Sequence, residues 1–387
     1  MHFAFFVFVC LFESTANATS NAGDKIQSDL VSWVRSKGGS FSDKLEIRRV
    51  DPEDPTSYMG VFVKDPIEAK ESLFVIPRDC FIHVFDTAET NPFEKTDETS
   101  YDTYHADLCK LANKLMGEMK LGDKSEYAPY IKYLQTQKPG QLPANWSPQG
   151  KELLREVATP GSSMVDWIDL NFRNCIGEKD DGEEISFEEH MVEITVQRCF
   201  DIALIPIWDM VNHDNGRINT ENDSMYEKDG MKVRASRKLE KGEEIFSTYD
   251  ACLDCKDLTE YWGTPEILKD FGFVENYPHR WVFSRYQIWF EVYMEDYGLD
   301  FESYFSGVKG GPPSKRQLEF LTEELARLDE LDPLEQDDDN IIPDHEFNTI
   351  VKFHEVAMED LEEVVLWFTK KAKEAADADA DASNGEL

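Results

Sequence analysis

The sequence predicts an α+β protein in which short strands are interrupted by a helical insertion and followed by a mainly helical C-terminal domain. Two apolar runs, GVFVK at residues 60–64 and SLFVI at residues 72–76, have strand character and are joined by a turn around Pro66. From about residue 100 to residue 190 the apolar residues recur at helical spacing, which returns in the last third of the chain. These patterns together indicate a core of short twisted sheets divided by helices.

The N-terminal residues resemble a signal peptide, which we place at residues 1–18. Residues 3–12 are apolar and are followed by small residues with an A-N-A step at Ala16 to Ala18, although no Lys or Arg precedes the apolar run. We therefore expect the secretory pathway, with a two-part plastid presequence as the alternative. The run is shorter than the roughly 20 residues that span a bilayer, and no later stretch without charges reaches that length, so we expect no membrane span.

Helical spacing then defines the following elements. Between residues 24 and 37, Ile26, Leu30 and Val34 lie four apart, and Gly38 with Gly39 ends the predicted helix. The inserted region begins with a helix whose apolar face comprises Leu108, Leu111, Leu115 and Met119, and Gly122 ends it. A further helix is expected near residues 185–200.

The last third of the chain also reads as helical. Ser314 is a predicted N-cap for a helix with Leu318, Leu321, Leu325 and Leu328 on one face. A final helix is expected from residue 344 to residue 373. The acidic, low-complexity tail at residues 376–387 is expected to be disordered.

The composition limits the classes of partner. Forty Lys and Arg residues against 78 Asp and Glu residues give a formal net charge of −38. Phosphate contacts need a basic surface, so we expect no nucleic-acid partner. A basic protein substrate suits this charge, although acidity can equally serve only to keep the protein soluble. We expect a monomer.

The cysteines do not form a dense disulfide framework. Of seven, Cys10 would leave with the signal peptide. Cys252 and Cys255 form a CxxC, which is compatible with half of a zinc site, a redox pair or a local disulfide. A closed zinc site needs four ligands, and the sequence has no second CxxC or His pair at suitable spacing. We therefore expect no metal site.

Two segments carry the strongest functional signal. Residues 203–219, ALIPIWDMVNHDNGRIN, form an apolar run of strand character that ends in Asp209, Asn212, His213 and Asp214. About thirty residues later, EEIFSTYDACLDC delivers Tyr249, and an aromatic turn follows that contains the triplet FGF at residues 271–273. Polar side chains gathered where buried elements end are typical of a functional site.

In this order, the segments resemble the closing motifs of the SET methyltransferase domain, in the subgroup of the Rubisco large-subunit lysine methyltransferase and the actin-histidine methyltransferase. The resemblance implies a SET domain at residues 24–280 with its helical insertion at about 100–190. It also implies a helical substrate-binding domain at residues 281–375. The expected activity is transfer of a methyl group from S-adenosyl-L-methionine to a protein side chain.

The resemblance also assigns the cofactor contacts. Asn212 and His213 match the pair that hydrogen-bonds the cofactor, and Asp209 precedes them. The guanidinium of Arg198 matches the contact to the cofactor carboxylate. The remaining cofactor positions are Met59 and Gly60 in the first glycine turn, and Phe273 over the adenine side. Ser57 stands where the family usually has a glutamate, which weakens the match at the cofactor amine.

Tyr249 matches the catalytic tyrosine, and Phe200 and Phe271 match residues that line the substrate channel. Neutralising a lysine of pKa about 10.4 near pH 7 costs about 4 to 5 kcal/mol, which burial in an aromatic channel helps to supply. Phe271 replaces a tyrosine that is common in the lysine enzymes.

Phe200 bears on the choice of acceptor. A histidine acceptor must be held in one tautomer by a hydrogen bond, which a phenylalanine ring cannot provide, whereas it suits the lysine stem. We therefore expect lysine, with histidine as the alternative because ALIPIWDMVNH followed by NG closely resembles the histidine enzyme.

Two other classes of protein remain as alternatives. One is a non-catalytic acidic binding module with the SET shape. The other is a metal-dependent hydrolase with Asp209, His213 and Asp214 as ligands.

Overall fold

The computed structural model describes residues 13–54, 57–85, 101–172, 175, 185–223, 227–249, 262–296, 298–336 and 341–384. The chain divides into two compact units. Unit 1 comprises Met1–Lys138, Arg198–Asn212 and Asn219–Phe246, and unit 2 comprises Pro139–Gln197, His213–Ile218 and Ser247–Leu387. Strands β8 (Asn212–His213) and β11 (Phe246–Ser247) each have one residue in either unit.

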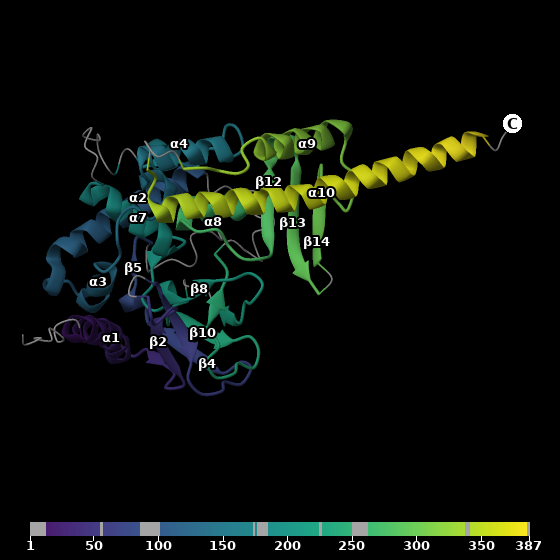
Figure 1. Ribbon diagram of the computed structural model, residues 1–387. Coiled ribbons are helices and arrows are strands. Elements are labelled where there is room, and N and C mark those ends of the chain that lie inside the picture. Colours follow the sequence, from purple (N-terminus) through teal and green to yellow (C-terminus); the bar gives the residue numbers. More distant parts are fainter. Residues whose placement is uncertain are drawn as a thin grey trace, which may run out of the picture. The chain divides into compact units, whose positions relative to one another are not determined.

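Unit 1 contains small antiparallel sheets and the first helices. Its helical elements are α1 (Glu13–Ser36), η1 (Arg78–Cys80), α2 (Tyr101–Leu121), η3 (Gly122–Lys124), α3 (Ala128–Leu134) and η5 (Trp208–Met210). One sheet has the order β1 (Ser40–Phe41), β4 (Ser72–Ile76), β10 (Met231–Ala235) and β9 (Thr220–Asn222). Another pairs β2 (Leu45–Arg49) with β3 (Met59–Val63), and a third has the order β5 (Ile82–His83), β7 (Ala203–Leu204) and β6 (Cys199–Phe200). Figure 1 shows β4 and β10 side by side.

Several predictions for unit 1 are confirmed. The two apolar runs form β3 and β4, and Leu30 and Val34 of α1 are fully buried. Helix α2 ends before Gly122, whose φ of +53° is the conformation expected of a helix-ending glycine. α1 continues without a break through Ala16 to Ala18, and the signal peptide stays a prediction.

The apolar run at residues 203–211 is not the long strand that its composition predicts. Only the two residues of β7 are strand, and the chain then turns through η5. Ile207 has a φ of +69°, which a β-branched side chain rarely adopts, and its side chain is fully buried. The run is apolar because it fills the core of unit 1 and not because it pairs along its length.

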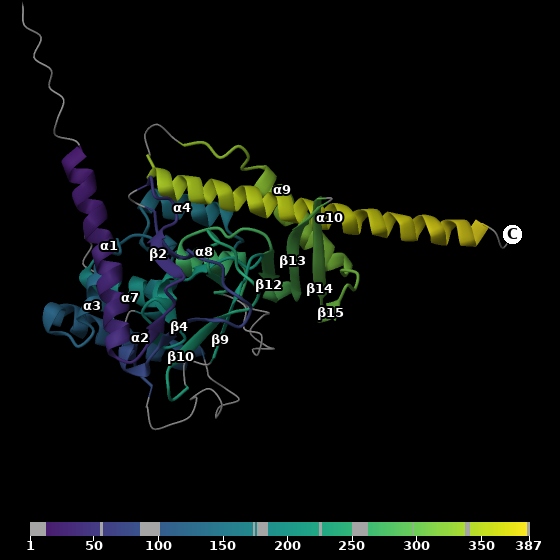
Figure 2. The ribbon, with the colours of Figure 1, turned by 90° about the horizontal axis from the view of Figure 1, so that it is seen from below.

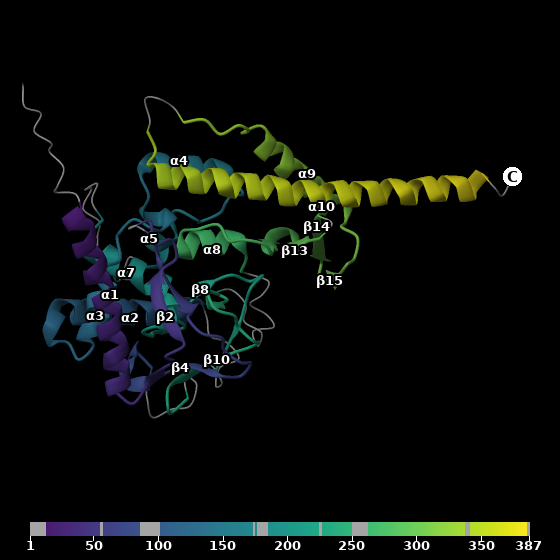
Figure 3. The same cartoon turned by 60° about the horizontal axis from the view of Figure 1, so that its bottom comes forward.

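Unit 2 has a four-stranded antiparallel sheet together with its helices. The helical elements are η4 (Pro143–Asn145), α4 (Pro148–Val157), α5 (Trp167–Asn171), α7 (Phe187–Arg198, its last residue in unit 1), α8 (Thr264–Phe271), η6 (Ser284–Tyr286), α9 (Lys315–Asp329) and α10 (Asp344–Asn384). The sheet has the order β12 (His279–Phe283), β13 (Ile288–Glu295), β14 (Gly298–Phe305) and β15 (Val308–Lys309). Helix α10 runs alongside α4 and α9 in Figure 1, Figure 2 and Figure 3.

The structure confirms the two C-terminal helices but adds elements that the helical prediction omits. The sheet occupies a region that was expected to be helical, and the alternation of IWFEVYME in β13 is the signal for it. Ser314 is the N-cap of α9, as predicted, and its hydroxyl accepts from the backbone N–H of Gln317. α10 continues to Asn384, through most of the tail that was expected to be disordered.

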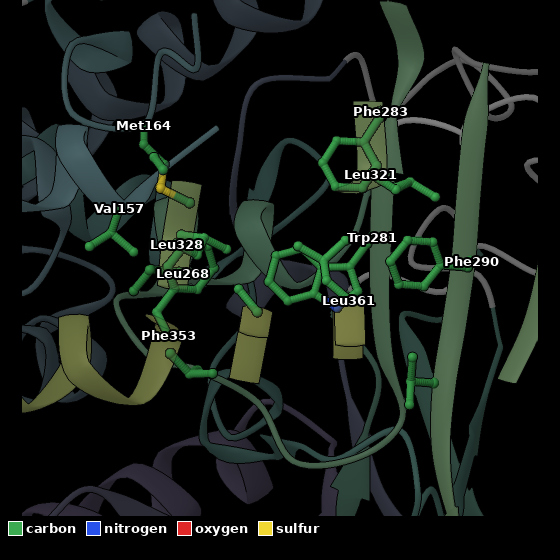
Figure 4. Packing of buried hydrophobic residues seen from close by; sticks show 14 of the residues in the cluster. Val157, Met164, Leu268, Trp281, Phe283, Phe290, Leu321, Leu328, Phe353 and Leu361 are labelled. Carbon is green, nitrogen blue, oxygen red and sulfur yellow. The ribbon is translucent and has the colours of Figure 1, made fainter. Parts of the chain in front are cut away.

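The core of unit 2 joins its sheet to its helices. Trp281 and Phe290 of the sheet point toward Leu268, Leu328 and Leu361 from three helices (Figure 4). These side chains are almost completely buried. Because α10 supplies a continuous apolar face to this core, the stability of α10 depends on tertiary packing more than on helix propensity.

Leu361→Ala therefore tests this packing, with Leu366→Ala as a control on the same helix. Leu361 is 1% exposed and Leu366 is 58% exposed. We expect Leu361→Ala to lower the free energy of unfolding by about 2 to 5 kcal/mol and Leu366→Ala by less than about 0.5 kcal/mol. Urea unfolding measures both, and equal losses would contradict the assigned core.

Candidate functional site

Gly60 and Asn212 lie together in unit 1, as the motifs predict. The side-chain amide of Asn212 donates to the backbone O of Met59 (3.1 Å) and to Oε1 of Glu244 (2.6 Å). A Cβ at Gly60 would clash with Oε1 of Glu244 and lie 3.1 Å from Nδ2 of Asn212. Glycine therefore allows the Glu244 carboxylate and the Asn212 amide to lie close to this backbone.

Arg198 and Asp209 belong to a buried polar network in unit 1. Nη1 of Arg198 donates to the hydroxyl of Tyr133 (3.0 Å) and to the backbone O of Asp209 (2.9 Å). The hydroxyl of Tyr130 donates to Oδ2 of Asp209 (2.9 Å), while Oδ1 is buried without a hydrogen-bond partner among the described residues. Burial raises the pKa of Asp209 from 3.8 to about 7, although Arg198 and Tyr130 act in the opposite direction.

Phe200 lies in β6, two residues after Arg198 in the chain. Its ring meets that of Trp208 edge to face, with centroids 5.8 Å apart, and it is half-buried. The position is apolar and close to the main chain that carries Asp209.

Tyr249 stands in an aromatic cluster in unit 2. Its ring centroid is 4.5 Å from that of Phe271 and 6.5 Å from that of Phe273. The ring of His213 lies 5.2 Å from Tyr249. The structure thus brings together four residues that the sequence motifs separate by up to about sixty positions.

The imidazole of His213 is committed to protein partners at both nitrogens. The backbone N–H of Tyr249 donates to Nδ1 (3.0 Å), and Nε2 lies 2.7 Å from Oε2 of Glu275. Its ring is therefore not available as a cofactor or metal ligand, and a cofactor contact by His213 would have to come from its main chain. This limits the expected role of His213 and removes the ligand on which the hydrolase alternative depends.

Gly272 explains why the aromatic turn has the form FGF. It ends α8 with a φ of +80°, and a Cβ there would clash with the backbone O of Gln141. The loop that carries Gln141 is held by the buried carboxylate of Glu193, which accepts from the backbone N–H groups of Gly140, Gln141 and Leu142. Phe271 and Phe273 are thus placed by a turn that only glycine fits well.

Four residues of these clusters lie outside the predicted site residues: Glu244, Tyr130, Tyr133 and Glu275. Each is an ordinary residue type in its segment, and a local pattern does not distinguish a buried partner from a solvated charge or a core ring. Glu275 follows Phe273 by two residues, and this closeness to the aromatic turn is the one signal in the sequence that could have indicated it.

The structure describes only some of the cysteines. Cys252 and Cys255 lie outside the described residues. Cys109 and Cys175 are disulfide-bonded, and Cys80 is a buried free thiol. Within the described ranges, no group of three or more His, Cys, Asp or Glu side chains could hold a metal ion. In the same part of the chain, no helix has the length and apolar character required to cross a bilayer.

Comparison with known proteins identifies the fold. Residues 58–250 match the family model of the SET domain. The SET domain of LSMT bound to lysine and AdoHcy is 11% identical, with a TM-score of 0.50 over 90% of this chain and 92% of that chain. Rubisco LSMT bound to sinefungin and monomethyllysine is 13% identical, with a TM-score of 0.52 over the same shares. Rubisco LSMT bound to AdoMet is 12% identical, with a TM-score of 0.51 over 89% of this chain and 92% of that chain.

Residues 58–250 are therefore a SET domain, and the predicted α+β fold class is confirmed. At these identities the likeness to the solved structures concerns the fold. The search among curated proteins finds no match for the chain.

Gly272→Ala tests the constraint at the aromatic turn, with Gly307→Ala as the control. The two glycines have similar φ angles of +80° and +76°, but nothing lies within 4 Å of a Cβ at Gly307. Backbone strain alone should cost each variant roughly 1 to 2 kcal/mol of unfolding free energy. Gly272→Ala should lose more, because its Cβ also meets the backbone of Gln141. Chemical denaturation measures the difference, and equal losses would show that the loop gives way.

Asp209→Asn tests the buried carboxyl. Between pH 3.8 and about 7 the folded state holds a proton that the unfolded state has released, so the unfolding free energy of the wild type falls as pH rises through this range. The amide does not titrate. We expect the stability of the wild type relative to Asp209→Asn to decrease from about pH 5 to about pH 8. Denaturation at both pH values measures it, and the opposite trend would indicate an ionised Asp209 stabilised by Arg198.

Proposed function

We propose that the chain is an S-adenosyl-L-methionine-dependent protein N-methyltransferase that acts on lysine side chains. The observation that carries the proposal is the aromatic cluster around Tyr249, in a chain whose residues 58–250 are a SET domain. Solved proteins of this fold are described as bound to AdoMet and to monomethyllysine, which supports the same chemistry here.

The residues of unit 1 suit the cofactor. When bound, S-adenosyl-L-methionine supplies a methyl group on a cationic sulfonium. The lack of a Cβ at Gly60 lets the side chains of Glu244 and Asn212 lie against its backbone, where the amide of Asn212 donates to the backbone O of Met59. We assign cofactor contacts to Met59, Gly60 and Asn212. The guanidinium of Arg198 would need to exchange part of its present network to reach a cofactor carboxylate.

The residues of unit 2 suit an amine acceptor. The rings of Tyr249, Phe271 and Phe273 present apolar faces that exclude water and disfavour a charged amine, while their π-systems attract a methyl with partial positive charge. The Tyr249 hydroxyl would orient the acceptor. His213, whose ring carries no free nitrogen, would act by holding the Tyr249 main chain.

Lysine is favoured over histidine because the substrate-side residues are apolar. Phe200 packs against Trp208, and Phe271 packs against Tyr249. Neither side chain can hydrogen-bond an imidazole to select its tautomer, whereas both can contact the four-carbon stem of lysine. The net charge of −38 suits a substrate protein with a basic surface.

Tyr249→Phe tests the assigned catalytic role. Loss of one positioned hydroxyl should lower kcat by roughly 10²-fold, whereas the affinity for S-adenosyl-L-methionine should change little. Turnover is measured with labelled cofactor and a lysate of source cells, and the affinity for S-adenosyl-L-methionine is measured by calorimetric titration. Equal loss of turnover and affinity would contradict this role.

The same titration separates an enzyme from a non-catalytic module, because a module that has kept only the shape should show no heat with the cofactor. Mass spectrometry of the labelled protein then identifies the modified side chain. Methylation of histidine alone would overturn the lysine assignment.

A further inference from the structure

Glu275 is the buried partner of His213. The residue is 3% exposed, and its two carboxylate oxygens face different elements of unit 2. Oε2 lies 2.7 Å from Nε2 of His213 and accepts from the side-chain amide of Asn215 (3.3 Å). Oε1 accepts from the hydroxyl of Thr264 (2.6 Å), the first residue of α8.

These contacts select one tautomer of His213. The backbone N–H of Tyr249 can only donate, so Nδ1 must accept and carries no proton. A carboxylate can only accept, so Nε2 must carry the proton that it donates to Glu275. The neutral Nε2–H form satisfies both partners at once, and the other tautomer satisfies neither.

The carboxylate is itself held in place from several sides. The hydroxyl of Thr264 donates to Glu275 and accepts from the backbone N–H of Arg280 (3.1 Å). Lys352 of α10 donates to the backbone O of Val274 (2.7 Å), directly before Glu275. A group whose backbone and side chain are both fixed has little freedom to release His213.

We propose that Glu275 is a positioning residue that fixes His213 in its Nε2–H tautomer and thereby holds the main chain of Tyr249 beside Phe271 and Phe273. The inference rests on the proposed function for its effect on turnover, but its structural part does not. A second carboxylate-to-amide change elsewhere in the unit can separate this role from a general effect on stability.

Glu275→Gln is the informative variant because it keeps the size of the side chain. If its amide N faces His213, it opposes the Nε2 proton. If its amide N faces Thr264, the Thr264 hydroxyl must accept from both the amide and Arg280 and loses the carboxylate to which it donates. Glu346→Gln is the matched control. Glu346 is 4% exposed and accepts from the backbone N–H and the hydroxyl of Ser147, with no contact to His213.

The experiment records the ring nitrogens of His213 by NMR in full-length protein labelled with ¹⁵N-histidine, with assignment from a His213→Gln spectrum. We expect the Nε2–H tautomer in the wild type and in Glu346→Gln, and a mixed or altered tautomer in Glu275→Gln. Turnover of Glu275→Gln should fall roughly 10- to 100-fold, by analogy with carboxylates that orient metal-bound histidines, with a smaller change in cofactor affinity. Thr264→Val, which removes one support of the carboxylate, should shift the spectrum in the same direction and replaces Glu275→Gln if that variant does not fold.

An unchanged His213 spectrum in Glu275→Gln, or an equal change in Glu346→Gln, would overturn the inference. If the wild type neither binds the cofactor nor methylates a protein, the proposed function fails, while the NMR comparison still decides the role of Glu275.

Discussion

The hydrogen bonds of one buried imidazole, that of His213, hold the aromatic cluster around Tyr249 together. His213 accepts from the main chain of Tyr249 and faces the carboxylate of Glu275, so a strand end, the segment after the aromatic turn and the tyrosine are joined through a single ring. In a buried setting a misplaced proton would leave a polar group without a partner, at a cost of about 1 to 3 kcal/mol. The position of the Tyr249 main chain, and with it the phenol, is therefore fixed by the hydrogen bonds of the His213 ring.

Close backbone approach is the second constraint on the site. Gly60 allows the Asn212 amide to reach the backbone of Met59, and Gly272 allows the turn between two aromatic side chains to pass next to Gln141. A Cβ at Gly60 would displace the Glu244 carboxylate, and a Cβ at Gly272 would meet the backbone O of Gln141. The positions of the motif residues therefore depend on the glycines next to them.

The sequence predicted the short strands, the inserted helix and the terminal helices, because the spacing of apolar residues is a local signal. The order of the motifs indicated the candidate site residues, whose roles stay predictions. The sequence could not predict that Nε2 of His213 faces the carboxylate of Glu275, because that pairing joins residues 62 positions apart. The sheet at β12 to β15 was missed although β13 alternates clearly, since the helical pattern on either side dominated the interpretation. Asp209, expected near the cofactor, is tied to Tyr130 by a contact that spans 79 positions.

The left-handed backbone of Ile207 links the interior of unit 1 to the segment that leads to Asn212. A branched residue in this conformation carries a conformational cost of about 1 to 3 kcal/mol, which burial of its side chain offsets. Replacement by glycine would relax the backbone but empty part of the interior. The geometry of this loop is therefore maintained by a buried apolar side chain in the core of unit 1, so a substitution at Ile207 would shift the segment that carries Asn212 while leaving Asn212 itself unchanged.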